Sequence, residues 1–191
     1  LGLENRAIDI ANDYMLTAKN FKKEDIVYDC GANVGDLALY LKNLNKEIKY
    51  VAFEPSPKEF ECLKLNVKND VTINSALHFK NSNLTFYVSS DNADSSLIAP
   101  IQFEEKIIVN SIRLDSFHKN KFGSKKIKLI KIEAEGAEPE VIRGCKEILH
   151  LVEYISADLG PERGQESKTT MASFINYLNM HNFEVVDVKF P

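Results

Sequence analysis

Ten residues from Ile26 to Gly35 read IVYDCGANVG and combine an acidic residue with a glycine-spaced turn. An apolar run leads into Asp29, and two glycines then allow a tight turn before a helix opens. A strand, turn and helix in this order form a cradle for a nucleoside cofactor at the carboxyl edge of a parallel sheet. We expect Asp29 to hold an ammonium group of that cofactor, directly or through water. The other expected contacts in the turn are Gly31, Ala32, Asn33 and Gly35.

The spacing of the glycines decides which cofactor this turn fits. A dinucleotide fingerprint reads Gly-x-Gly-x-x-Gly and, started at Gly31, needs glycines where the chain has Asn33 and Asp36. The carboxylate of Asp29 also disfavours a pyrophosphate, which must approach backbone N–H groups unopposed. S-adenosylmethionine carries a sulfonium, an ammonium group, a ribose and an adenine, and it has no phosphate. The motif therefore predicts S-adenosylmethionine, although an ordinary turn with a capping carboxylate has a similar pattern.

A second acidic residue, Glu54, ends the next apolar run and precedes Pro55. Nucleotide-binding sheets place an acid at this position, where it accepts hydrogen bonds from the ribose hydroxyls. We expect Glu54 and Pro55 to contact the cofactor. Asn74 and Ala76, at the end of the third predicted strand, could flank the adenine, and ordinary packing would explain those two residues as well.

Two further glutamates, Glu133 and Glu135, follow a nearly continuous apolar run within KIEAEGAEPE (131–140). Open α/β sheets bind ligands at the edge where the strand order reverses, which is the expected place of this segment. Carboxylates there could favour a sulfonium, orient an acceptor hydroxyl or bind a divalent metal, although no other motif supports a metal. Helix N-capping explains part of the cluster, namely Glu138 and Glu140. We expect Glu133 to be catalytic and Glu135 to bind the cofactor.

The acceptor side of the site has two candidate bases, Asp158 and His78, each at or just past the end of a predicted strand. Either could remove the proton of an acceptor hydroxyl. In the loop that follows Asp158, Arg163 could pair with an anionic acceptor, and Glu162 adjoins it. Turn capping, a surface ion pair and simple solvent exposure are the ordinary alternatives for these residues.

Strand and helix patterns alternate nearly throughout the chain, which is typical of a parallel α/β sheet. The alternation breaks at 84–88 and 107–114, where we expect an inserted antiparallel strand pair, with a polar loop at 91–100 between them. The lysine-rich stretch 119–131 predicts a solvated connection. The expected fold is a three-layer αβα sandwich with a mostly parallel sheet. Its predicted strands are 26–30, 50–53, 71–77, 127–133, 154–159 and a closing strand at 183–190.

Length and composition describe an ordinary globular chain. We expect residues 1–191 to form a single domain, with an N-terminal helical segment at 1–24 and an insertion and loop region at 78–125. A net charge of −4 at pH 7 argues against nucleic acid as a partner. The three cysteines form no CxxC pair, which favours reduced thiols, and no apolar run approaches the roughly 20 residues of a membrane span. The expected protein is soluble and cytoplasmic.

Three blocks of the chain resemble the FkbM-type methyltransferases, a branch of the class I S-adenosylmethionine-dependent enzymes. They read DCGANVGDLALYL, VAFEPSP and LIKIEAEGAEPEVIRG, so the resemblance covers about 26–144 and extends weakly to the end. It implies a Rossmann-like fold and O-methylation, commonly on a sugar or secondary metabolite. Ser95 and Ser96 lie where similar enzymes often carry a serine pair near the site. The chain departs from the family at Glu133, where Asp is usual, and at Ala134, where a β-branched residue is usual; the longer side chain of Glu133 argues against a strict metal-ligand role.

Together these features predict an S-adenosylmethionine-dependent O-methyltransferase acting on a hydroxyl of a sugar, a polysaccharide precursor or a secondary metabolite. One alternative is a non-catalytic S-adenosylmethionine-binding domain, which needs only the first two motifs. Another is a nicotinamide-dependent oxidoreductase, which the glycine spacing disfavours. Nucleic-acid bases are disfavoured as targets because EAEG stands where base-methylating enzymes usually carry [DN]PP[YF]. The identity of the acceptor, the group that activates it and the oligomeric state stay open.

Overall fold

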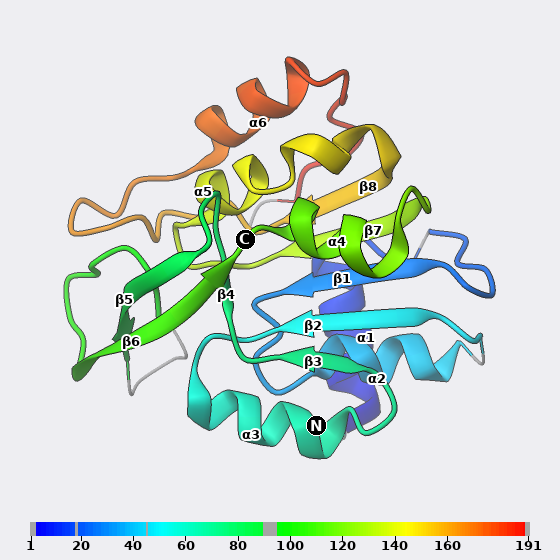
Figure 1. Cartoon of the computed structure of the whole chain (residues 1–191), viewed down its shortest axis with the longest axis horizontal. Helices are drawn as coiled ribbons and strands as arrows, with labels where there is room; N and C mark the ends of the chain where they lie inside the picture. The colour runs from blue at the N-terminus through cyan, green and yellow to red at the C-terminus, as the bar shows by residue number, and fades with distance from the viewer. Residues whose placement is uncertain (1–2, 18, 45, 90–94, 190–191) are drawn as a thin grey trace.

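A five-stranded parallel sheet forms the centre of the computed structural model, which describes residues 3–17, 19–44, 46–89 and 95–189. Its strand order is β3-β2-β1-β7-β8, and every neighbouring pair runs parallel (Figure 1). The order reverses between β1 and β7, so ligands are expected at the carboxyl ends of these two strands. The strands are β1 (Ile26–Cys30), β2 (Lys49–Phe53), β3 (Val71–Ile73), β7 (Ile127–Ile132) and β8 (Val152–Ala157).

Helices cover both faces of this sheet and complete three layers, as the sequence predicts. One face packs against α1 (Leu3–Asp13), α2 (Asp36–Asn43) and α3 (Pro57–Asn66). The other packs against α4 (Leu114–Phe122), α5 (Glu138–Arg143), the 3₁₀ helix η1 (Lys146–Leu151) and α6 (Met171–Asn179). The predicted α/β class, with a mostly parallel sheet between two helical layers, is confirmed.

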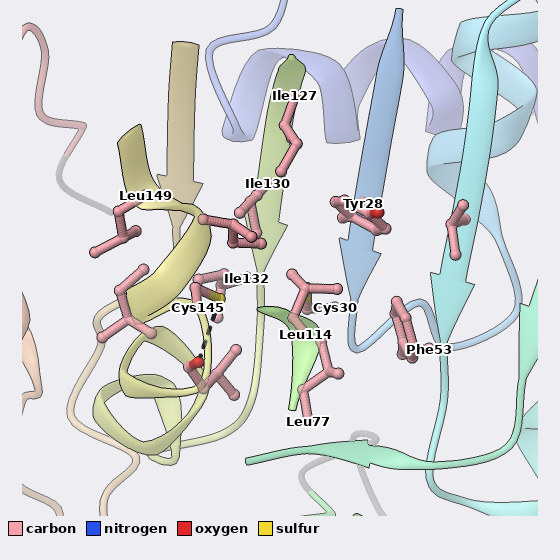
Figure 2. Close-up of a cluster of buried hydrophobic side chains, with 14 of the residues drawn as sticks. Tyr28, Cys30, Phe53, Leu77, Leu114, Ile127, Ile130, Ile132, Cys145 and Leu149 are labelled. Atoms are coloured by element: carbon pink, nitrogen blue, oxygen red, sulfur yellow. Dashed lines mark hydrogen bonds between the residues drawn. The ribbon is translucent and has the colours of Figure 1, made fainter. Parts of the chain in front are cut away.

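Alternation along each strand assigns its side chains to the two faces. In β1, Tyr28 and Cys30 join the core beneath α4 and α5, whereas Val27 joins the core beneath α1 and α2. Figure 2 shows the first of these cores, in which Tyr28 and Cys30 lie near Phe53 of β2 and Ile132 of β7. Asp29 therefore shares the face of Val27, a placement that matters for the site below.

A second, smaller sheet lies beyond the carboxyl ends of the central strands (Figure 1). It contains β4 (Ala76–Leu77), β5 (Ser82–Val88) and β6 (Glu105–Ile112) in the order β4-β6-β5. β5 and β6 are antiparallel, which confirms the predicted inserted pair, and β4 adds a parallel neighbour to β6. Phe86, Val109 and Ala76 form the small apolar core of this sheet.

The predicted strand 71–77 is wrong as a single element. β3 ends at Ile73, and the N–H of Ser75 then donates back to the Ile73 carbonyl in a turn. The side-chain amide of Asn74 donates to the carbonyls of Glu54 and Pro55, which holds the chain where it leaves the large sheet. The remaining two residues, β4, pair with β6 instead.

Two other predictions about elements also fail. The closing strand 183–190 is wrong over the described part, 183–189, which has neither helix nor strand and exposes Val185, Val186 and Val188; residue 190 lies outside the described residues. The lysine-rich stretch is only partly a solvated connection, because Lys128 and Lys131 are buried within β7. Within the described residues no helix is long and apolar enough to cross a bilayer.

Tyr28 and His118 form a buried hydrogen bond between β1 and α4, with 2.7 Å between the Tyr28 hydroxyl and Nδ1 of the histidine. Nε2 of His118 lies 3.0 Å from the Lys125 carbonyl, so it donates and Nδ1 accepts from the tyrosine. Burial lowers the pKa of His118, which keeps this neutral tautomer in the folded protein.

We predict that Tyr28→Phe lowers the free energy of unfolding by about 1–2 kcal/mol, because Nδ1 loses its buried donor. Urea unfolding monitored by circular dichroism measures the change. Tyr40→Phe is the matched control, since the half-buried Tyr40 hydroxyl makes no hydrogen bond within the described residues. An equal effect of the two substitutions would contradict the prediction.

Candidate functional site

A cavity of about 290 Å³ lies at the carboxyl ends of β1, β2 and β7, against the small sheet. Most of the predicted cofactor contacts line it, together with the predicted catalytic residue Glu133. The predicted residues in its wall are Gly31, Asn33, Glu54, Pro55, Ala76, Ser95, Glu133 and Glu135. Asp29, Ala32, Gly35, Asn74, His78 and Asp158 are not among the lining residues.

The two glycines of the turn have different physical roles. Gly31 has φ 79°, and a Cβ there would lie 1.8 Å from the carbonyl oxygen of Glu133. Only glycine allows β1 and β7 to approach so closely at this edge. Gly35 has φ 92°, and its Cβ would meet Leu63 and Val67 of the α3 region at 2.8 Å. Gly31 thus shapes the cavity, whereas Gly35 permits helix packing behind it.

The backbone amides of the turn already have partners in the protein. The N–H groups of Gly31 and Ala32 both donate to the Phe53 carbonyl at 3.0 Å. The N–H of Asn33 donates to Oε2 of Glu54 at 2.8 Å. A phosphate-binding turn directs such amides toward its ligand, so this turn is not arranged as a phosphate cradle.

Glu54 is fixed at the end of β2 by backbone donors on both of its oxygens. Asn33 donates to Oε2, and Ser56 donates to Oε1, each at 2.8 Å. The residue is only 6% exposed, yet its side chain lines the cavity. Burial raises the pKa of Glu54 to about 7, although the two backbone hydrogen bonds oppose the shift. Each oxygen keeps a second lone pair, so the carboxylate can accept two more hydrogen bonds.

Asp29 is held inside the protein rather than at the cavity wall. It is 1% exposed and receives a 2.5 Å hydrogen bond from the Tyr50 hydroxyl. Its Oδ1 lies 3.1 Å from Nζ of Lys131, the residue beside it in the β1–β7 register. Because Asp29 lies within β1 and not after it, the alternation of the strand directs its side chain beneath α1 and α2.

Lys131 connects Asp29 to Glu133. Its ammonium lies 2.8 Å from Oε2 of Glu133 and donates to the Gly31 carbonyl at 2.8 Å. Three oxygens thus lie within 3.1 Å of it, as many as it has N–H groups. Burial alone would lower the pKa of Lys131, but the charges of Asp29 and Glu133 raise it. The lysine is therefore a fixed internal cation.

Glu133 belongs both to this cluster and to the cavity wall, and its side chain is 39% exposed. Burial alone would raise its pKa, but Lys131 and a hydrogen bond from Tyr14 lower it below the usual range. Glu133 is therefore an ionised carboxylate facing the cavity. A carboxylate with a lowered pKa is a weak base and a good partner for a cation.

The loop after Glu133 is held by side chains around it. The Ser96 hydroxyl donates to the Glu135 carbonyl at 2.6 Å, which links this loop to the small sheet. One oxygen of Glu138 accepts from the N–H groups of Ala134 and Gly136, and the other accepts from Thr170. Glu138 thus holds the loop that precedes α5, and the helix-capping role predicted for it stays a prediction. Ser95, which lines the cavity, accepts from the N–H of Ser89.

The acceptor-side candidates lie outside the cavity wall. His78 stacks on Phe79, and burial lowers its pKa. Asp158 accepts from the N–H of Gly160, as in a turn cap. Arg163 forms a paired contact with both oxygens of Glu140 at 2.8 Å and donates to the Gly136 carbonyl. The Arg163 guanidinium thus forms an ion pair within the protein, as the ordinary alternative for that residue expects. Glu162 has interactions of its own.

Several wall residues were not among the site residues expected from the sequence. Phe53, Leu77, Phe86, Leu97, Ala137 and Val141 give part of the cavity an apolar surface, and Arg6, Ser56, Glu59 and Ser75 add polar groups. Ser56, Glu59 and Ser75 follow the ends of β2 and β3, so strand-end position could have indicated them. Within the residues described here, no group of three or more His, Cys, Asp or Glu side chains is arranged to hold a metal ion.

We predict that Lys131→Met lowers the free energy of unfolding by about 3–5 kcal/mol, because Asp29 is left buried without its cation. Lys128→Met, in the same strand, is the control: Lys128 pairs with Glu153, whose side chain is 53% exposed. That substitution is expected to cost less than about 1 kcal/mol. Urea unfolding of both variants makes the comparison, and equal losses would contradict the central role of Lys131.

Comparison with known proteins finds relatives that are named as methyltransferases. A 182-residue match to "Methyltransferase 1" of Beauveria bassiana is 24% identical and covers 80% of this chain and 72% of that protein. "2-O-methyltransferase NoeI" of Sinorhizobium fredii is 24% identical, with 89% of this chain and 76% of that protein covered. "Methyltransferase sdnD" of Sordaria araneosa is 25% identical, with coverages of 73% and 67%.

The fold has a counterpart among solved structures. The crystal structure of Methyltransferase FkbM from Methylobacillus flagellatus superposes with a TM-score of 0.60 at 12% identity. The superposition covers 88% of this chain and 40% of that one, so the present chain spans less than half of that protein's length. The model of the methyltransferase FkbM domain matches residues 29–185. That match spans the turn, both strand-end glutamates and all five central strands except the first three residues of β1, and the chain therefore belongs to the FkbM methyltransferase family.

Proposed function

We propose that the protein is an S-adenosylmethionine-dependent O-methyltransferase acting on a hydroxyl of a sugar, a polysaccharide precursor or a secondary metabolite. The observation that carries this proposal is Glu54, a buried carboxylate held by two backbone donors in the wall of the cavity. Its free lone pairs suit the two hydroxyls of a ribose. Family membership supports methyl transfer, and the name of NoeI, a 2-O-methyltransferase, supports oxygen as the acceptor atom.

The chemistry of the cavity wall fits a cofactor that is cationic at one end and apolar at the other. Glu54, Glu59, Glu133 and Glu135 contribute acidic groups, and Leu77, Phe86 and Val141 contribute an apolar surface suited to a purine. The backbone N–H groups of Gly31, Ala32 and Asn33 already donate to acceptors within the protein. This argues against a pyrophosphate and hence against a nicotinamide cofactor. We therefore favour an adenosyl ligand without phosphate.

Bound S-adenosylmethionine supplies an electrophilic methyl group on a sulfonium. In our proposal, Glu133 places its negative charge where that cationic end lies, because its carboxylate is ionised and lines the cavity next to Gly31. In our proposal the cavity aligns the two reactants, which is the main contribution that such a site makes to displacement. Transfer forms a carbon–oxygen bond, breaks the carbon–sulfur bond and releases the hydroxyl proton. Asp158 and His78 stay predictions for the group that accepts this proton.

Glu54→Gln is predicted to weaken S-adenosylhomocysteine binding by about tenfold or more, because an amide N–H₂ must then face either Asn33 N–H or Ser56 N–H. Isothermal titration measures the affinity, and NAD is the competing candidate ligand. Glu61→Gln is the control, since Glu61 pairs with Lys64 on the exposed side of α3. Unchanged affinity in Glu54→Gln, or tight binding of NAD alone, would contradict the proposal.

The pKa of Glu54 near 7 predicts a pH-dependent affinity. The ionised form accepts both ribose hydroxyls, so affinity rises as the pH increases through about 7 and falls below it. 5′-Methylthioadenosine suits this measurement because it keeps the ribose and has no group that titrates near neutral pH. Between about pH 6 and about pH 8 its affinity should rise severalfold in the wild type and stay flat in Glu54→Gln. A flat wild-type profile would show that Glu54 does not contact the ribose.

A further inference from the structure

One group of the proposed cofactor has no partner among the residues assigned so far. The ribose is matched by Glu54, the cationic end by Glu133, and the adenine by an apolar wall. The α-carboxylate at the amino-acid end is an anion, and the acidic residues of the wall repel it. A cation or a set of unused backbone N–H groups is needed near the turn.

Two other groups near the turn that could bind a carboxylate already have partners within the protein. The ammonium of Lys131 is surrounded by Asp29, Glu133 and the Gly31 carbonyl and lies beneath the wall. The N–H groups of Gly31, Ala32 and Asn33 donate to Phe53 and Glu54. Neither can bind a carboxylate without breaking contacts that hold the turn.

Arg6 is the cationic side chain left in the cavity wall, and the sequence motifs did not indicate it. It lies on α1 and, of the described residues that line the cavity, it is the one lysine or arginine. Its Nε and Nη2 both contact Oδ2 of Asp36, at 2.7 and 2.6 Å. Asp36 is the first residue of α2, directly after the glycine turn, so this ion pair fixes the guanidinium beside the turn.

The geometry of the ion pair leaves room for a second anion. Both contacts use the same oxygen of Asp36 and one edge of the guanidinium, so Nη1 has no part in them. The Arg6 side chain is 59% exposed, so a ligand in the cavity can reach it. A guanidinium can bind two carboxylates at once because its donors point along separate edges.

We propose that Arg6 binds the α-carboxylate of the adenosyl cofactor, and that the N-terminal helix α1 is thereby part of the cofactor site. This inference rests on the proposed function. In this inference one residue outside the glycine turn, Arg6, distinguishes adenosyl ligands that retain the amino-acid part from those that lack it.

The test compares two ligands that differ only in the amino-acid end: S-adenosylhomocysteine and 5′-methylthioadenosine. We expect Arg6→Gln to weaken S-adenosylhomocysteine binding by about tenfold and to leave 5′-methylthioadenosine within about twofold. Arg6→Lys, which keeps the charge, should retain part of the affinity. Arg143→Gln, an exposed arginine on α5 outside the cavity wall, is the control and should change neither ligand.

Asp36→Asn separates ligand binding from support of the fold. It removes the charge of the ion pair but keeps the guanidinium and an amide oxygen that can still accept from it, so S-adenosylhomocysteine affinity should stay within about threefold of the wild type. A loss in Asp36→Asn equal to that in Arg6→Gln would overturn the inference. The inference would also be overturned if Arg6→Gln and Arg6→Lys each weakened the binding of S-adenosylhomocysteine and of 5′-methylthioadenosine to the same extent. If the wild type bound neither ligand, the proposed function would fail together with this inference.

Discussion

The buried ammonium of Lys131 holds together the two strands at which the sheet reverses its order. It neutralises Asp29 on β1, contacts Glu133 at the end of β7 and donates to the Gly31 carbonyl in the turn between β1 and α2. Removal of the cation would leave two carboxylates close together, one of them fully buried. The close approach of Gly31 to Glu133 occurs at the same place. The floor of the cavity therefore depends on this ion cluster.

The same cluster divides the acidic residues of the site into two groups. Asp29 is compensated inside the protein by Lys131 and Tyr50. Glu54 has only neutral backbone donors, so burial raises its pKa to about 7 and a ligand with hydroxyl donors stabilises its ionised form. Glu133 is shared, because Lys131 keeps it ionised while its side chain reaches the cavity. An acidic wall with one peripheral arginine, Arg6, suits a ligand that carries a cation and a carboxylate at the same end.

The sequence predicted the parallel sheet, its helical layers and the inserted strand pair, because apolar alternation and glycine turns are local signals. It did not predict that Asp29 turns away from the cavity, since the motif marks a strand end and the register of β1 with β7 decides the face. Lys131 lies in a lysine-rich stretch, so the sequence did not distinguish it from its exposed neighbours. Its partners follow only from the pairing of β7 with β1. Arg6 contributes through the packing of α1 against α2, and no local pattern encodes that contact. The predicted closing strand is absent because the valine-rich stretch 185–188 has no strand partner within the described residues.

The most direct test of the central claim is a crystal structure of the protein with S-adenosylhomocysteine. We expect the ribose hydroxyls within hydrogen-bonding distance of the Glu54 carboxylate, the sulfur beside Gly31 and Glu133, and Lys131 still paired with Asp29. A ligand bound elsewhere, or one whose ribose faces away from Glu54, would contradict it.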